Sequence, residues 1–221
     1  MTWLKICGTT SLTDAELSVS FGADALGFIF AESPRRIDLV LAAEIIGALP
    51  AEVEKIGVFV SESPARVGEI AARVGLTGAQ LQGDESAEQL AEFRKALGDR
   101  RIIQTVQASR LLGEGLDGWA SNLGPLGNVD AVLLDSGSAA KLGGTGIPFD
   151  WEKALPQART IQSFVPLIIA GGLNPQNVGE ALRLFHPWGI DVVSGVEREP
   201  GKKDEVKLRE FIAAVRQQPA G

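Results

Sequence analysis

Short apolar runs alternate with segments of helical periodicity along nearly the whole chain. The apolar runs are of strand length and lie near residues 3–7, 24–30, 55–60, 79–82, 102–106, 130–135, 166–170 and 190–194. Between them, apolar residues recur every three to four positions, as they do within 67–74, 90–97, 178–185 and 208–215. A run buried on both faces is typical of a parallel strand, and the three-to-four spacing is typical of one helix face. The pattern therefore predicts strands and helices in alternation.

Several helix starts carry capping signals in the sequence. The candidates are Thr13 with Glu16 and Ser86 with Gln89, as capping boxes, Ser63-Pro64 and Asn174-Pro175, as caps before a first-turn proline, and Asp150. An oxygen-bearing side chain at these positions accepts from a backbone N–H that the first helical turn leaves without a partner. The weakest unit is the stretch 107–129, which is rich in glycine and poorly periodic.

Eight strand–helix units in 221 residues predict an α/β protein, a single-domain (β/α)8 TIM barrel spanning residues 1–221. A doubly wound open sheet is the second choice. In a barrel, the functional site lies at the carboxyl ends of the strands. That rule selects Cys7, residues 30–36, Gln82-Gly83, Asp135, residues 171–174 and residues 194–196.

Composition narrows the class of protein further. The apolar runs are far shorter than the roughly 20 residues of a membrane span, and the first residues lack the pattern of a signal peptide. One cysteine cannot form an internal disulfide, so we expect a cytoplasmic protein. We also expect a monomer or a homodimer. A net charge of -7 argues against a nucleic-acid surface, and a single histidine excludes a multi-histidine metal site.

The last two strands both end in small residues. Gly171-Gly172 follows the seventh strand, and Ser194-Gly195 follows the eighth. In a barrel, the loops after these two strands often bind phosphate through backbone N–H groups, which small residues allow an anion to approach. Two consecutive strands that are followed by small residues indicate a phosphate site. The alternative is a pair of ordinary tight turns.

Two residues at strand ends could move protons. Cys7 ends the first strand, where it is either a small buried hydrophobe or a thiolate base facing the site. Asp135 ends the run AVLLD, where it either caps the next turn or, held in a partly dry cleft, acts as an acid. The two residues could therefore divide the roles of base and acid.

Two loops complete the candidate site. SPRRID, residues 33–38, is either a solvated loop or a guanidinium fork that grips a substrate carboxylate. The glycine-rich loop at 142–151 could act as a lid, and it lacks the Gly-Lys-Ser/Thr ending of a nucleotide-binding loop.

With these segments the sequence resembles the phosphoribosylanthranilate isomerases of tryptophan biosynthesis over nearly its whole length. The matching segments, in order, are KICGTT at 5–10, GADALGFIF at 22–30, SPRR at 33–36, GVFV at 57–60, LLDS at 133–136, GGTGIPFDW at 143–151, AGGLNPQNV at 170–178 and SGVEREPGKKD at 194–204. So many segments in one order and spacing are more specific than any single motif.

The resemblance implies an Amadori rearrangement of a small phosphorylated substrate with no metal or coenzyme. It implies that Cys7 is the general base, Asp135 the general acid and Arg35 the partner of the anthranilate carboxylate. The phosphate would lie in the segments that contain Gly172, Asn174, Ser194 and Gly195.

The chain departs from the family pattern at two positions near the site. Gln82 stands where the family commonly has histidine, and Val193 where it often has serine. The presumed base and acid are both present. Two other functions stay open at this point: a phosphosugar-binding barrel without catalysis, and another phosphosugar isomerase or epimerase.

Overall fold

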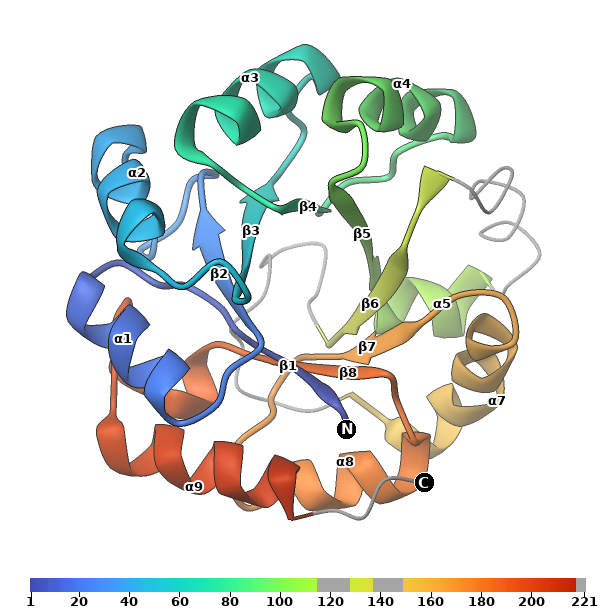
Figure 1. Ribbon diagram of the computed structural model, residues 1–221. Helices are drawn as coiled ribbons and strands as arrows, with labels where there is room; N and C mark the ends of the chain where they lie inside the picture. Colours follow the sequence, from blue (N-terminus) through green and yellow to red (C-terminus); the bar gives the residue numbers. More distant parts are fainter. Residues whose placement is uncertain (115–127, 137–148, 218–221) are drawn as a thin grey trace.

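A closed barrel of eight parallel strands forms the centre of the protein (Figure 1). The computed structural model describes residues 1–114, 128–136 and 149–217. The strands are β1 (Trp3–Ile6), β2 (Ala25–Ile29), β3 (Glu54–Phe59), β4 (Gly78–Leu81), β5 (Arg101–Gln107), β6 (Ala131–Asp135), β7 (Leu167–Ile169) and β8 (Gly189–Val192). Each strand pairs with the next along the chain, and β8 closes on β1. The barrel prediction is confirmed. That residues 1–221 form one domain stays a prediction.

Helices surround the strands, as Figure 1 shows. They are α1 (Leu12–Ser20), α2 (Leu39–Ala48), α3 (Pro64–Val74), α4 (Ala87–Leu97), α5 (Ala108–Glu114), α7 (Trp151–Gln162), α8 (Val178–Phe185) and α9 (Glu205–Arg216). The predicted apolar faces are buried against the barrel, and Val67, Leu90 and Val178 have no exposed surface. None of the described helices is long and apolar enough to cross a membrane. Helix α5 lies in the weakly periodic stretch, of which 115–127 are outside the described residues.

Three of the predicted helix caps are confirmed and two are wrong. The Ser63 side chain accepts from the N–H of Arg66, Ser86 and Gln89 form a full capping box, and Asp150 accepts from Lys153. Helix α1 is capped by Ser11, two residues before the predicted Thr13. Helix α8 begins at Val178, and Asn174 instead accepts from the N–H groups of Gln176 and Asn177. The Asn174 side chain therefore stabilises the turn before the helix, with the kind of hydrogen bond that the sequence predicted for the first turn of the helix itself.

The barrel interior is apolar at the amino ends of the strands and polar nearer the carboxyl ends. The apolar layer consists of Trp3, Ala25, Ile56, Ile103, Ala131 and Ile168, and Leu133 and Ala170 continue the same cluster toward the carboxyl ends. Trp3 stacks on Trp188 at 4.9 Å between ring centroids, and the Arg101 guanidinium lies over both rings. Because alternate residues of a strand face the interior, Lys5 and Cys7 follow Trp3 on the inner side of β1. The apolar layer thus supports a polar layer directly above it.

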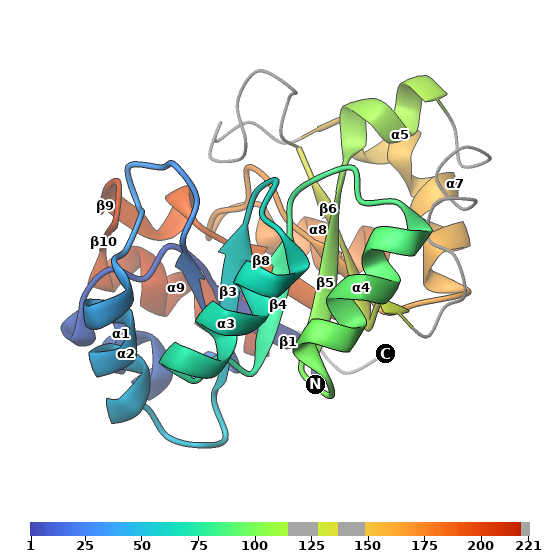
Figure 2. The same cartoon turned by 90° about the horizontal axis from the view of Figure 1, so that it is seen from above.

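A short hairpin after β8 was not predicted from the sequence. The turn η2 (Ser194–Val196) leads into β9 (Glu197–Glu199), which pairs with β10 (Lys202–Lys203). The hairpin lies beside α1, where the N–H of Lys203 donates to the Asp14 carboxylate at 3.1 Å (Figure 2). Residues 197–203, within the segment SGVEREPGKKD, therefore form a two-stranded element beside α1.

Candidate active site

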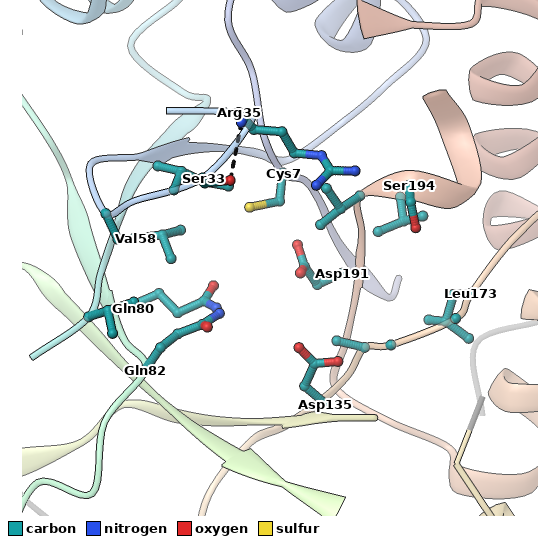
Figure 3. Close-up of a pocket in the computed structure, with 18 of the residues that line it drawn as sticks. Cys7, Ser33, Arg35, Val58, Gln80, Gln82, Asp135, Leu173, Asp191 and Ser194 are labelled. Atoms are coloured by element: carbon teal, nitrogen blue, oxygen red, sulfur yellow. Dashed lines mark hydrogen bonds between the residues drawn. The ribbon is translucent and has the colours of Figure 1, made fainter. Parts of the chain in front are cut away.

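A cavity opens at the carboxyl ends of the strands and gathers most of the predicted site residues (Figure 3). Of the seven residues proposed from the sequence, those that line it are Cys7, Arg35, Asp135, Gly172 and Ser194. Asn174 and Gly195 do not line it; Asn174 lies in the loop after β7 and Gly195 in η2, after β8. The strand-end rule therefore brings together residues that are far apart in the sequence.

Cys7 stands at the end of β1 with its thiol directed into the cavity (Figure 3). Its N–H donates to the carbonyl of Val192 at 2.9 Å, which continues the β1–β8 pairing by one residue. The side chain is only 3% exposed. Burial raises the pKa of the Cys7 thiol and nearby Asp191 raises it further, while Lys5 and Lys203 act to lower it. Burial and Asp191 therefore favour the thiol form of Cys7, and the two lysines favour its thiolate.

Asp135 ends β6 and faces the same cavity. Figure 3 shows its carboxyl group across the pocket from Cys7, with Asp191 between them in this view. A Cβ on the neighbouring Gly171 would overlap the hydroxyl and backbone nitrogen of Ser136 and lie 2.6 Å from the Asp135 Oδ1. Gly171 also has a φ of +81°, which residues with a side chain rarely adopt. Any side chain at this position after β7 would therefore collide with the end of β6, where the presumed acid lies.

Arg35 is held in place by a buried carboxylate. Its Nε donates to both oxygens of Glu197 at 3.0 Å and its Nη2 to one of them at 2.7 Å. Glu197 also accepts from Lys203 at 3.2 Å, and the same Lys203 ammonium donates to the carbonyl of Cys7 at 2.5 Å. Burial acts to raise the pKa of Glu197, but Arg35 and Lys203 bring it below its ordinary value. One ionic network therefore joins Arg35, the predicted partner of the substrate carboxylate, to the backbone of Cys7, the predicted base.

The loops that follow β7 and β8 pack closely against each other. A Cβ on Gly195 would overlap the carbonyl oxygen of Leu173 and lie 3.0 Å from the Asn174 Cα. Only glycine allows the two backbones this close, so the loops after β7 and β8 are in direct backbone contact. Gly172, with a φ of +68°, and Ser194 border the cavity from these loops.

A polar layer closes the cavity from below. The Lys5 ammonium donates to Asp191 Oδ1 and to Gln80 Oε1, both at 2.8 Å. Burial acts to lower the pKa of Lys5, but attraction to Asp191 and to ionised Cys7 outweighs it and the pKa is raised. Asp191 and Gln80 line the cavity. Sequence reasoning missed all three residues, although a lysine and an aspartate inside apolar runs were a usable signal.

The comparison with protein families shows to which family the chain belongs. The family model for N-(5'-phosphoribosyl)anthranilate (PRA) isomerase matches residues 4–214. The chain belongs to the PRA isomerase family. Curated PRA isomerases from Geobacter sulfurreducens and Bacillus cereus AH187 are 43% and 41% identical to it. The alignments cover 96% and 95% of this chain, and 97% and 95% of the relatives.

Solved PRA isomerase structures share the fold as well as the sequence. The Thermotoga maritima enzyme is 35% identical, with a TM-score of 0.83, over 99% of this chain and all of that one. A PRA isomerase solved with reduced 1-(o-carboxyphenylamino)-1-deoxyribulose 5-phosphate is 34% identical, with a TM-score of 0.80 and the same coverage. The Thermus thermophilus enzyme is 33% identical, with a TM-score of 0.80, over 98% of both chains.

Two residues at which we expected a departure from the PRA isomerase pattern border the cavity. Gln82, at the end of β4, and Val193, after β8, line it together with Cys7 and Asp135. Both departures from the family pattern therefore lie where a ligand would touch them. Of the possible lid at 142–151, residues 142–148 are outside the described part of the chain.

Proposed function

We propose that this chain converts N-(5'-phosphoribosyl)anthranilate to 1-(o-carboxyphenylamino)-1-deoxyribulose 5-phosphate, an Amadori rearrangement of tryptophan biosynthesis, using its own side chains alone. The observation that carries the proposal is the meeting of Cys7 and Asp135 in one cavity, at the ends of β1 and β6. Membership of the PRA isomerase family supports it.

The chemistry needs one acid and one base. Asp135, in its protonated form, gives a proton to the furanose ring oxygen, and the ring C–O bond breaks to leave a Schiff base at C1. The Cys7 thiolate then takes the proton from C2, which gives an enolamine that tautomerises to the ketone. Each group ends the reaction in the opposite protonation state, so one proton exchange between them or with water restores both.

The two ends of the substrate bind at different parts of the cavity in this proposal. The phosphate lies against the joined exits of β7 and β8, at Gly172, Ser194 and Gly195, while Asn174 shapes the turn rather than contacting the anion. The anthranilate carboxylate pairs with Arg35. In the described part of the chain, the side-chain bonds of Arg35 use Nε and Nη2, and Nη1 remains for a ligand. A guanidinium already fixed on one edge loses little freedom on binding.

The test is turnover of freshly prepared phosphoribosylanthranilate, followed by the loss of its fluorescence. Because the substrate is labile, an enzyme-free sample measures its spontaneous decay, and chromatography identifies the carboxyphenylamino-deoxyribulose phosphate product. We expect saturable turnover with this product. Saturable binding of the product analogue without turnover would instead indicate a phosphosugar-binding barrel that has lost catalysis.

A further inference from the structure

A buried lysine lies two residues before the presumed base, on the same inner side of β1. Lys5 has no exposed surface, and it is held by Asp191 on β8 and Gln80 on β4 at 2.8 Å each. The β1–β8 register pairs Lys5 with Asp191, so barrel closure itself sets this contact. A lysine with two acceptors in a packed interior cannot swing away, and its charge is fixed in position.

Lys5 and Cys7 occupy the space that a missing side chain leaves on the neighbouring strand. A Cβ built on Gly27 would lie 2.5 Å from the Cys7 sulfur and 3.0 Å from the Lys5 Cε. The sulfur and the end of the lysine stem are therefore neighbours over Gly27. A larger residue at this position of β2 would push the two groups out of place.

We propose that Lys5 is a positioning residue for the base: its fixed ammonium stabilises the thiolate of Cys7, and Asp191 and Gln80 hold that ammonium beneath the sulfur. The proposal rests on the proposed function, in which Cys7 removes the C2 proton. It assigns to the Lys5–Asp191 pair a role in the reaction beyond filling the barrel.

The other charges around Cys7 do not replace Lys5. Lys203 also favours the thiolate, but its ammonium is bound to the Cys7 carbonyl and to Glu197. Asp191 disfavours the thiolate, and burial disfavours it most. Arg35 and Asp135 border the same cavity, Arg35 paired with Glu197. Without Lys5, burial and Asp191 both keep the proton on sulfur, so the thiol should ionise only at higher pH.

The chain is well suited to a direct measurement, because it has one cysteine and no tyrosine. The ultraviolet absorbance of the thiolate can therefore be titrated without a tyrosinate background, with Cys7→Ser as the baseline. In Lys5→Met we expect the thiolate fraction at a fixed pH below the transition to fall about tenfold or more, since a close opposite charge favours ionisation by at least that factor. The pH profile of kcat should move to the alkaline side in parallel.

Two further variants keep the test decisive. Lys5→Met leaves the Asp191 carboxylate buried without its partner, so Lys5→Met with Asp191→Asn removes both charges of the pair and preserves packing. Because the end of the Lys5 stem packs beside the Cys7 sulfur over Gly27, we expect the double variant still to shift to the alkaline side, by less than Lys5→Met alone. Lys55→Met is the matched control, because Lys55 is also a buried lysine on a strand and donates to the Pro50 carbonyl. The Cys7 thiolate should titrate in this variant as it does in wild type.

The outcomes separate this proposal from the proposed function. A folded double variant whose thiolate titration matches wild type would overturn the role of Lys5. Wild-type turnover in Cys7→Ser would overturn Cys7 as base, while the absorbance titration would still report whether Lys5 stabilises its thiolate.

Discussion

Gly195→Ala is the substitution that most directly probes the joined exits of β7 and β8. The added Cβ would overlap the Leu173 carbonyl oxygen and lie 2.9 Å from its carbon and 3.0 Å from the Asn174 Cα. All three atoms belong to backbone, so no side chain can rotate away to relieve the contact. The two loops must move apart, and the N–H groups that we assign to the phosphate must separate.

The size of the effect follows from the crowding. Overpacking of this kind costs roughly 1–3 kcal/mol. If that strain falls mainly on the bound state, where the loops must converge on one anion, affinity falls by roughly 5- to 150-fold. The loss should be seen in KM and in inhibition by inorganic phosphate. The kcat at saturation should change less, because Cys7 and Asp135 stand on β1 and β6.

The assay compares Gly195→Ala with wild type in KM, in the inhibition constant of inorganic phosphate and in the unfolding midpoint. Gly47→Ala is the control, because nothing lies within 4 Å of a Cβ at this position of α2. Alanine there should stabilise the helix by about 0.5–1 kcal/mol and leave the kinetics unchanged. A stable Gly195→Ala with wild-type KM and phosphate inhibition would refute the assignment of the phosphate to these exits.

Four other variants test other parts of the site. Cys7→Ser should lower kcat by about 10²-fold or more at unchanged affinity for a product analogue, because a hydroxyl is too weak an acid to replace a thiolate base; wild-type kcat would place the base elsewhere. Arg35→Met should raise KM by the loss of about 1.5–3 kcal/mol, while the exposed Arg36→Met should do much less; the reverse ranking would move the carboxylate grip to Arg36. The pKa of Glu197 lies below its ordinary 4.5 in the folded protein, so its stabilisation is present above pH 4.5 and is lost as pH falls through the folded pKa. Denaturant titrations should show the stability gap between wild type and Glu197→Gln shrink below pH 4.5, and a gap that is constant with pH would contradict the charged pairing.

The fold was predictable because the strands of a barrel are buried on both faces, which leaves an unmistakable apolar run in the sequence. Cap positions were less predictable. Ser11 and Thr13 both carry the hydroxyl that a cap needs, and only the path of the chain decides between them. Asn174 forms the expected kind of bond, to a turn rather than to the helix.

The site was predictable as far as strand ends define it, which located Cys7, Asp135 and Arg35. The ionic groups that support them were missed because their partners are distant in sequence. Lys5 and Asp191 are 186 residues apart and meet only when β8 closes on β1. Opposite charges at equal depth in the first and last strands of a closed barrel would have predicted that pair.

The most direct test of the central claim is Asp135→Asn, which keeps size and hydrogen-bonding capacity while removing the transferable proton. We measure kcat on fresh phosphoribosylanthranilate and the unfolding midpoint on the same preparation. A proton donor at this position predicts a folded, stable variant whose kcat is lower by about 10²-fold or more, with little change in affinity for a reduced product analogue. A variant with near-normal kcat and a stability loss of around 1 kcal/mol would instead make Asp135 a cap of the following loop and contradict its role as the acid.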